Sequence, residues 1–231
     1  MFKIRKIVIP LATAMLVACA GNQGKSISTE PQALSETQPD AAPADDDAAI
    51  EASYYMQQLA AIRADSLKAV EATDWLKFRK DFLKCKLSQP KRFNASALET
   101  VIKLARKSGD NEEELKVSKE LLDVDFTNIF AHYTIATSPN VDDNVKEFHQ
   151  KVIGKILQSI GDSGKGYSTE TAMYVINIGE EYDFLHFNGF KPIRQELIEE
   201  NGRQYDRMIT EGNDGKKYQF YFDVTDFFGH Y

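Results

Sequence analysis

The dipeptide Asn201-Gly202 constrains the fold of this 231-residue chain more than any other feature. It separates two strand-like runs, residues 193–200 and 203–210. Asn-Gly favours the left-handed backbone of a two-residue turn, so the segment predicts an antiparallel hairpin. In that register Glu196 lies opposite Arg207, which places opposite charges across from each other on one face. The chain must therefore contain a sheet near its C-terminus.

The second face of this hairpin carries Ile193, Leu197 and Met208, which we expect to pack inward. Asp206 lies on the same apolar face, opposite Leu197. A carboxylate in that position is either hydrated near the edge of the sheet or a functional group in a pocket. The sequence leaves both interpretations open.

Three further segments complete the expected sheet half. The run AMYVINI, residues 172–178, is apolar almost throughout and predicts a central strand. The run GEEYDFLHFNG, residues 179–189, starts with acidic side chains and ends in Asn-Gly, which predicts a short helix. The run KKYQFYFDVT, residues 216–225, alternates and predicts the last strand.

Upstream of the sheet, apolar side chains recur at helical spacing, as in the stripe formed by Trp75, Phe78 and Phe82. Helices are expected at residues 54–87, 96–108, 111–125, 127–137 and 140–161. Short polar turns between them predict antiparallel helical hairpins. The run LLDVDFTNIFAHYTIA, residues 121–136, resembles a tetratricopeptide-type junction, but no second copy follows at a fixed period. We therefore expect a small helical layer rather than a stacked array.

The expected fold class is α+β, with N-terminal helical hairpins packed on a C-terminal antiparallel sheet that has one short helix inserted. The helical region is assigned to residues 51–166 and the sheet region to residues 167–231, together one compact unit. A hydrophobic share of 42% is sufficient for such a core.

The first nineteen residues, MFKIRKIVIPLATAMLVAC, predict export. Basic side chains precede an apolar run, residues 7–17, that is too short to span a bilayer and is typical of a signal peptide. The end of the run, LVAC, resembles a bacterial lipobox, which implies that a signal peptide of residues 1–18 is removed and that Cys19 is acylated, for instance with palmitate. An ordinary signal peptide with a chance cysteine is the alternative. Acylation predicts that the N-terminal lipid holds the protein on a membrane.

Residues 19–50 predict a flexible tether. They are small, polar, acidic and proline-containing, and such a composition cannot bury enough apolar surface to fold. With Cys19 lipidated, Cys85 is the one remaining thiol, and its place in a helical pattern favours a packed core residue over a nucleophile.

The net charge of −7 argues against a nucleic-acid partner, because phosphate binding requires a clustered basic face. The run GDSGKGYSTET, residues 161–171, looks like a phosphate-binding loop, but no glycine precedes Gly164 by five positions. The run also leaves a helix and enters a strand, the reverse of the order that a phosphate loop requires. We therefore expect no bound nucleotide and interpret these glycines as turn positions.

The run SIGDSGKGYSTETAMYVINIGEEYDFL, residues 159–185, is similar to a segment of the family catalogued as domain of unknown function 4919, uncharacterised lipoproteins of Gram-negative bacteria. The pieces that carry the similarity are Ser159-Ile160, Ser163-Gly164, Gly166, Ser168, Glu170–Ala172, Glu180–Tyr182, NGRQYD at residues 201–206 and YFDVTDFFG at residues 221–229. The resemblance extends from about Trp75 onward and departs from the family at Lys165, which lies between the glycines rather than after the second one. It implies a Gram-negative cell envelope and no known activity.

A candidate ligand pocket is expected where the loop meets the short helix and the hairpin. Its candidate residues are Ser163, Lys165, Thr171, Glu180, Glu181, Tyr182, Tyr205 and Asp206. Paired carboxylates do acid–base chemistry when their environments differ, whereas adjacent acidic residues that open a helix are commonly surface groups favoured by its dipole. We assign no catalytic residue, metal ligand or cofactor, because the sequence contains no nucleophile elbow, zinc spacing or triad-like cluster and its histidines are isolated from one another.

Together these features predict a lipid-anchored, non-catalytic module of the cell envelope that binds a protein or a ligand. The alternative is a small-molecule-binding or hydrolytic envelope protein with a carboxylate and tyrosine pocket. A deep pocket around the acidic residues would favour the alternative, and a grooved apolar helical face would favour a partner-binding module.

Overall fold

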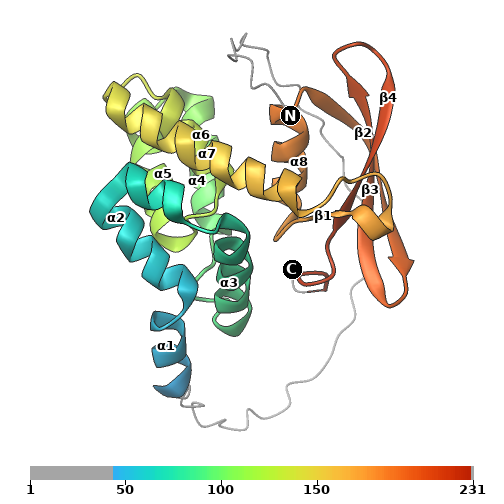
Figure 1. Cartoon of the computed structure of the whole chain (residues 1–231). Helices are drawn as coiled ribbons and strands as arrows, with labels where there is room; N and C mark the ends of the chain where they lie inside the picture. Colours follow the sequence, from blue (N-terminus) through green and yellow to red (C-terminus); the bar gives the residue numbers. More distant parts are fainter. Residues whose placement is uncertain (1–43, 230–231) are drawn as a thin grey trace, which may run out of the picture. The chain divides into compact units, whose positions relative to one another are not determined.

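The computed structural model describes residues 44–229, and Cys19 with the rest of the N-terminal predictions lies outside them. A series of helices precedes a four-stranded sheet, which confirms the α+β class (Figure 1). The helices are α1 (Ala44–Glu51), α2 (Tyr54–Ala72), α3 (Trp75–Ser88), α4 (Ser96–Ser108), α5 (Asn111–Val124), α6 (Ile129–Thr137), α7 (Asp143–Ser163) and α8 (Ile178–Phe187), with a 3-10 turn at Thr169–Thr171. The strands are β1 (Met173–Tyr174), β2 (Phe190–Glu200), β3 (Arg203–Gly212) and β4 (Lys217–Asp223).

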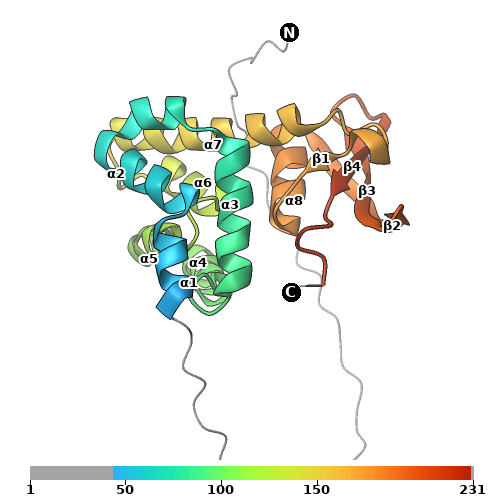
Figure 2. The ribbon, with the colours of Figure 1, turned by 60° about the horizontal axis from the view of Figure 1, so that its bottom comes forward.

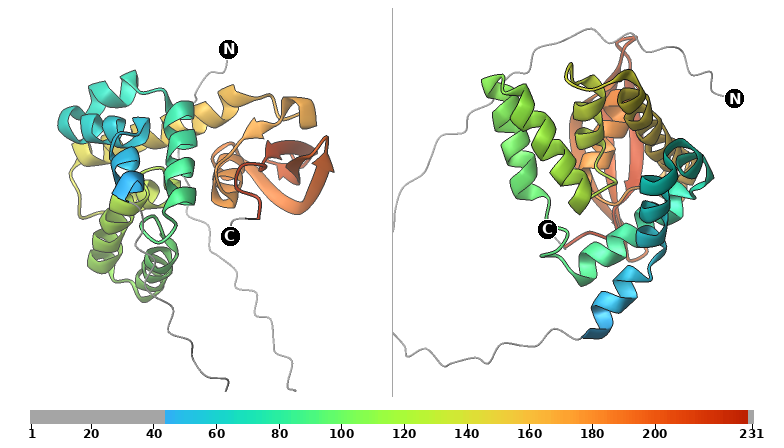
Figure 3. Two further views of the ribbon diagram at one scale, coloured as in Figure 1. Left: turned by 90° about the horizontal axis from the view of Figure 1, so that it is seen from below. Right: turned by 90° about the vertical axis from the view of Figure 1, so that its left-hand side faces the viewer.

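The helices pair consecutively, because each loop between them is short. Helix α4 lies along α5, and α6 lies along α7 (Figure 3). The predicted stripe on α3 is confirmed, since Trp75, Phe78 and Phe82 are all buried. Their rings contact Tyr55 of α2 and one another at centroid distances of 4.7–5.1 Å, the range in which tilted aromatic pairs attract. These aromatic contacts form the centre of the helical core.

Helix α1 begins inside the segment predicted to be a tether. Residues 44–51 are helical, and Ile50 is 4% exposed in the core. Glu51 forms an ion pair with Arg92, which joins this first helix to the end of α3. The buried Ile50 and the polar contacts of Asp47 and Glu51 with Gln89 and Arg92 thus extend the folded part upstream of residue 51.

The sheet is mixed, with strand order β1-β4-β3-β2. The predicted wholly antiparallel sheet is corrected at β1, which pairs with β4 in parallel. The run 172–178 is also not a central strand, because only Met173 and Tyr174 pair and they do so at the edge. Val175 and Ile176 are buried as the chain leaves the sheet, and Asn177 then caps α8. A run of apolar residues marks burial here rather than a long strand.

The hairpin has the predicted register. Asn201 and Gly202 both adopt positive φ angles, 52° and 74°, which is the backbone that a two-residue turn of this type requires. Glu196 pairs with Arg207 across the strands and forms an ion pair with it, and Leu197 pairs with Asp206. This register determines which residues of β2 and β3 face α8.

Helix α8 packs on one face of the sheet (Figure 2). Leu185 of α8 is fully buried, and the ring centroids of Phe184 in α8 and Phe222 in β4 are 6.1 Å apart. Met208 on this face is buried as expected, and Asp206 beside it is buried too, which excludes a hydrated position at the edge of the sheet. Near the free edge the cover is incomplete: Ile193 and Leu197, predicted to pack inward, are each 51% exposed.

Candidate functional site

The loop between α7 and β1 is held by its own backbone. Gly166 donates its N–H to the carbonyl of Thr171 (2.7 Å), and its carbonyl accepts the N–H of Tyr221 in β4 (3.0 Å). A Cβ on Gly164 would lie 2.3 Å from the carbonyl oxygen of Ala172, so only glycine fits there. The glycines that resemble a phosphate loop therefore close a tight turn against the sheet.

Three candidate residues belong to this loop. The Ser163 hydroxyl donates to the carbonyl of Ile160 and accepts the N–H of Tyr174, so it links the end of α7 to β1. The Thr171 hydroxyl accepts the N–H groups of Tyr167 and Ser168 within the turn. Lys165 is exposed. Two of the three are thus used as local structural contacts.

Helix α8 places two adjacent carboxylates in different surroundings. Asn177 caps the helix by accepting the N–H of Glu180 (2.9 Å), which fixes the direction of the first turn. Glu180 and Glu181 are successive residues and so point in directions about 100° apart around the helix axis. Both are buried, at 2% and 0% exposure.

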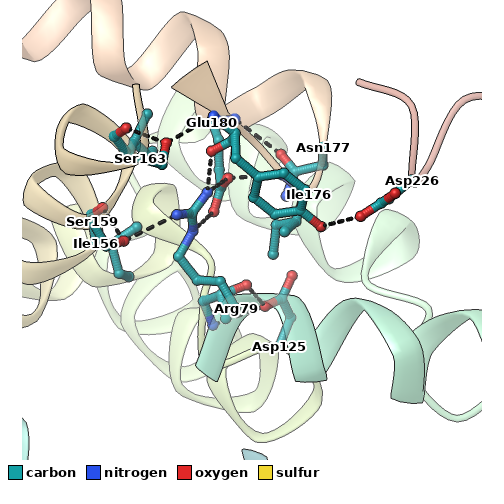
Figure 4. Close-up of polar contacts among 12 residues, drawn as sticks. Arg79, Asp125, Ile156, Ser159, Ser163, Ile176, Asn177, Glu180 and Asp226 are labelled. Carbon is teal, nitrogen blue, oxygen red and sulfur yellow. Dashed lines mark hydrogen bonds and ion pairs between the residues drawn. The ribbon is translucent and has the colours of Figure 1, made fainter. Parts of the chain in front are cut away.

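Glu180 forms a buried ion pair with Arg79 of α3, which joins the helical layer to α8 (Figure 4). The guanidinium binds the carboxylate with two nitrogens, and Nε donates to Oε1 at 2.8 Å. Its remaining donors reach the Ser159 hydroxyl and the Tyr174 carbonyl, both at 3.0 Å. The N–H of Ile176 also donates to Glu180 (3.0 Å). The network is satisfied, and its partners come from five segments of the chain.

Glu181 points the other way, toward the sheet. Neither of its carboxylate oxygens has a hydrogen-bond partner in the described part of the chain. Burial raises its pKa to about 10, helped by the nearby negative charge of Asp206 and, less strongly, of Glu180. A buried carboxyl of this kind is protonated at neutral pH, so it acts as a neutral acid beside Asp206.

Gln195 and Tyr182 complete the surroundings of Asp206. Gln195 of β2 donates from its amide nitrogen to the Asp206 carboxylate, and its amide oxygen accepts the Tyr182 hydroxyl (2.9 Å). Tyr182 is 41% exposed, so this chain of contacts runs from the buried acids to the surface. The structure thus brings three candidate residues together, Glu181, Tyr182 and Asp206.

Tyr205 does not join them. It precedes Asp206 on β3, so its side chain lies on the opposite face of the sheet, where it pairs with Ile198 and Asp223. Arg79 and Gln195 were not predicted, although Arg79 had a signal in the sequence. It lies four residues after Trp75 and three before Phe82, on the same buried face of α3.

A second buried polar pair lies within the helices. The Nδ1 atoms of His132 and His149 are 2.7 Å apart, and Nε2 of His132 lies 3.0 Å from the carbonyl of Phe126. A carbonyl only accepts, so Nε2 of His132 carries a proton and its Nδ1 accepts one from His149. Burial lowers both pKa values, to about 3 for His132 and about 4 for His149, with the neighbouring His149 and Lys119 as the second causes. His149 therefore has a satisfied hydrogen bond, to a histidine that is far from it in the sequence.

Across residues 44–229, no group of three or more His, Cys, Asp or Glu side chains could hold a metal ion. No helix in that range is long and apolar enough to cross a membrane. Cys85 is a buried free thiol, as its helical pattern predicted, and burial raises its pKa.

Among the hollows on the surface of the described residues, two are lined by residues other than the buried acids. One, of about 610 Å³, lies on α4 and α5 and is lined by Val101, Leu104, Ala105, Lys107, Ser108, Asp110 and Glu113. The other, of about 400 Å³, lies between the 3-10 turn and the hairpin and is lined by Ser168, Thr169, Glu170, Ile198, Glu199, Glu200 and Tyr221. The loop does meet the hairpin, as predicted, but away from Glu180 and Glu181.

The family model described as "Domain of unknown function (DUF4919)" matches residues 75–231. No curated protein and no solved structure matches the chain at a significant level. The match covers more than half of the chain and includes α3 to β4, with both Arg79 and the acidic residues of α8. The chain therefore belongs to the DUF4919 family.

Proposed function

We propose that this protein is a lipid-anchored, non-catalytic binding module of the Gram-negative cell envelope, and that it binds a partner protein at the hollow on α4 and α5. The lipobox-like end of the predicted signal peptide supports the anchor. The exposed apolar surface of α4 supports the binding role, and it is the observation on which the proposal rests.

Helix α4 is apolar on two sides. Ile102 and Ala105 face the core, whereas Leu104 and Val101 are 61% and 37% exposed in the hollow. Leu104 and Val101 leave apolar surface uncovered in this hollow, against which the apolar side chains of a partner would pack. Charged side chains of both signs, such as Lys107 and Glu113, line the same hollow and suit a partner helix with one apolar face.

The buried acids support the absence of catalysis. Glu180 is neutralised by Arg79, and Glu181 has no exposed surface. A general acid or base must come within hydrogen-bond distance of its substrate, which these two carboxylates do not offer from either hollow.

A site-specific photo-crosslinker at position 104 tests the binding surface in intact envelopes. We expect one discrete crosslinked product from position 104 and none from Lys217, an exposed position on β4 that serves as the control. A Leu104→Glu variant, crosslinked from the neighbouring position 101, should reduce the product severalfold. The same products from positions 104 and 217, or no product from either, would contradict the proposed surface.

Metabolic labelling with a fatty acid tests the anchor. Cys19→Ser should abolish the label and release the protein from membranes or leave it unprocessed. Labelling of a Cys85→Ser control should match the wild type, because Cys85 is buried and not part of the lipobox. An unmodified N-terminus on mature wild-type protein would exclude lipidation.

The unpartnered Glu181 favours a second candidate, a small-molecule-binding or hydrolytic protein. A protonated buried carboxyl beside a second buried carboxyl is an arrangement used in acid–base catalysis. This function requires α8 and β2 to separate so that a ligand can reach Glu181. Hydrolysis of an ester or glycoside that Glu181→Gln abolishes, with the fold intact, would establish this alternative over the first.

A further inference from the structure

Strand β2 leaves one long edge of the sheet unpaired. It is 11 residues long and pairs with β3 alone among the described elements (Figure 1). A bulge between Pro192 and Arg194 interrupts it near its start, and the remainder is regular. Soluble proteins rarely leave a long regular edge open, because its free N–H and C=O groups pair readily with another strand.

The apolar layer beneath α8 continues to this edge without cover. Ile193 and Leu197, each 51% exposed, flank Gln195, and Tyr182 of α8 contacts Gln195 beside them at 41% exposure. Leu197 shares its face with the buried Asp206 and Met208. The apolar core is therefore incompletely covered at β2, and a further strand beside β2 would cover its exposed apolar side chains.

The charges of β2 are divided between its halves. The first half carries Lys191 and Arg194, and the second half carries Glu196, Glu199 and Glu200. Lys191, Glu199 and Glu200 have no ion-pair partner in the described part of the chain. A strand that is basic at one end and acidic at the other complements a copy of itself running in the opposite direction.

We propose that β2 pairs antiparallel with β2 of a second copy of this chain, about a two-fold axis at Gln195. In this register Leu197 lies opposite Ile193 of the other copy, at the bulge. Arg194 lies opposite Glu196, which it already contacts within its own chain, so the axis is surrounded by four alternating charges. The two four-stranded sheets join into one of eight, and the two uncovered apolar patches meet.

The adjacent registers fail on the same residues. If the register between the two β2 strands shifts by one residue, a side chain on the α8 face of one copy lies opposite a side chain on the outer face of the other. Opposite residues in a continuous sheet must lie on the same face. A shift of two places either Arg194 opposite Arg194 or Glu196 opposite Glu196 of the second copy. Parallel pairing places every charge opposite itself. The charge pattern thus disfavours the neighbouring antiparallel registers and parallel pairing.

Cysteine crosslinking of the full chain in its native membranes tests the axis. Residues opposite each other in adjacent antiparallel strands have Cβ atoms about 4.5–5.5 Å apart, close enough for a disulfide. Under mild oxidation Gln195→Cys should give a dimer of twice the mass of the monomer, and the Lys217→Cys control should not. Ile193→Cys and Leu197→Cys should crosslink when the two variants are mixed, and neither should do so alone.

A charge exchange gives a measurement that does not depend on replacing Gln195. Arg194→Glu should weaken the dimer at least about tenfold in detergent, measured by native mass spectrometry, and Arg194→Glu with Glu196→Arg should restore it. A monomer at all concentrations, a crosslink from Ile193→Cys alone, or a Gln195→Cys adduct with a different protein would each overturn the proposal. Circular dichroism identifies any variant that fails to fold.

Discussion

Glu181 buries both of its carboxylate oxygens beside Asp206, and neither oxygen has a hydrogen-bond partner among the described residues. Such a group destabilises a folded protein once it ionises, because an unpaired buried charge loses its hydration. The pKa of about 10 shows how the protein avoids this cost: the carboxyl keeps its proton through the neutral range. The stability of the fold is therefore coupled to pH through this residue.

Glu181→Gln should remove that dependence. The ordinary pKa of the carboxyl is 4.5 and the folded pKa is about 10, so its contribution to stability is full below pH 4.5 and is lost as the pH rises toward 10. The variant should match the wild type near pH 4 and exceed it increasingly from pH 6 to 9, by at most about 1.4 kcal/mol per pH unit. Urea unfolding at several pH values measures this difference. A variant destabilised equally at every pH would show that Glu181 is ionised or paired in the fold.

The histidine pair predicts that stability decreases as the pH falls in the acid range, the opposite of the pH dependence caused by Glu181. His132 and His149 have pKa values of about 3 and 4 in the fold against an ordinary 6.5, so both rings stay neutral at pH 5. Their contribution to stability is full above pH 6.5 and is lost as the pH falls from 6.5 through the folded pKa values of about 4 and about 3.

Nuclear magnetic resonance titration of the ring carbons measures the histidine charges directly. We expect both rings to show unchanged shifts between pH 7.5 and 5, with the Nδ1–H tautomer at His149 and the Nε2–H tautomer at His132. The signals of the exposed His186 are recorded in the same spectra for comparison. Protonation of either buried ring above pH 6 would contradict this assignment.

Removal of one partner from the Arg79–Glu180 pair should be costly. Arg79→Met leaves Glu180 buried without its main partner, and Glu180→Gln leaves a buried guanidinium without its countercharge. Each single change should cost about 3–5 kcal/mol of unfolding free energy, and the double change Arg79→Met with Glu180→Gln should cost less than the sum. Denaturant unfolding of the four proteins measures the coupling. Strictly additive losses would mean that the ion pair does not hold α3 to α8.

The features that sequence predicts well here are local. The hairpin follows from Asn201-Gly202, whose backbone preference acts over two residues, and the short helix at 178–187 follows from its capping residues. The run 172–178 misleads because apolar composition reports burial, and both a strand and an irregular buried segment satisfy it. Local preference decides turns and helix ends, whereas pairing partners decide whether a strand forms.

The candidate site depends on distant contacts and is predicted only in part. Leu197 opposite Asp206 follows from the hairpin register, but Arg79 and Glu180 are 101 residues apart in the chain. His132 and His149 lie on different helices and meet because α6 and α7 pack side by side. No spacing rule within one element connects such residues. Their partners become visible only once the helices are placed.

Glycines in the loop between α7 and β1 and in α7 itself should respond oppositely to replacement by alanine. Gly164→Ala should cost at least about 2 kcal/mol of stability, because its Cβ would lie 2.3 Å from the carbonyl oxygen of Ala172 and 2.7 Å from that of Thr171. Both neighbours are backbone atoms of the same tight turn, so the strain cannot be relieved by rotating a side chain. Gly154→Ala, in the exposed middle of α7 with no atom within 4 Å of the added Cβ, is the matched control and should raise stability by up to about 1 kcal/mol. Thermal unfolding of the two variants measures this difference. If the loop were an open phosphate-binding loop instead of a tight turn packed on the sheet, the protein would tolerate Gly164→Ala as well as it tolerates Gly154→Ala.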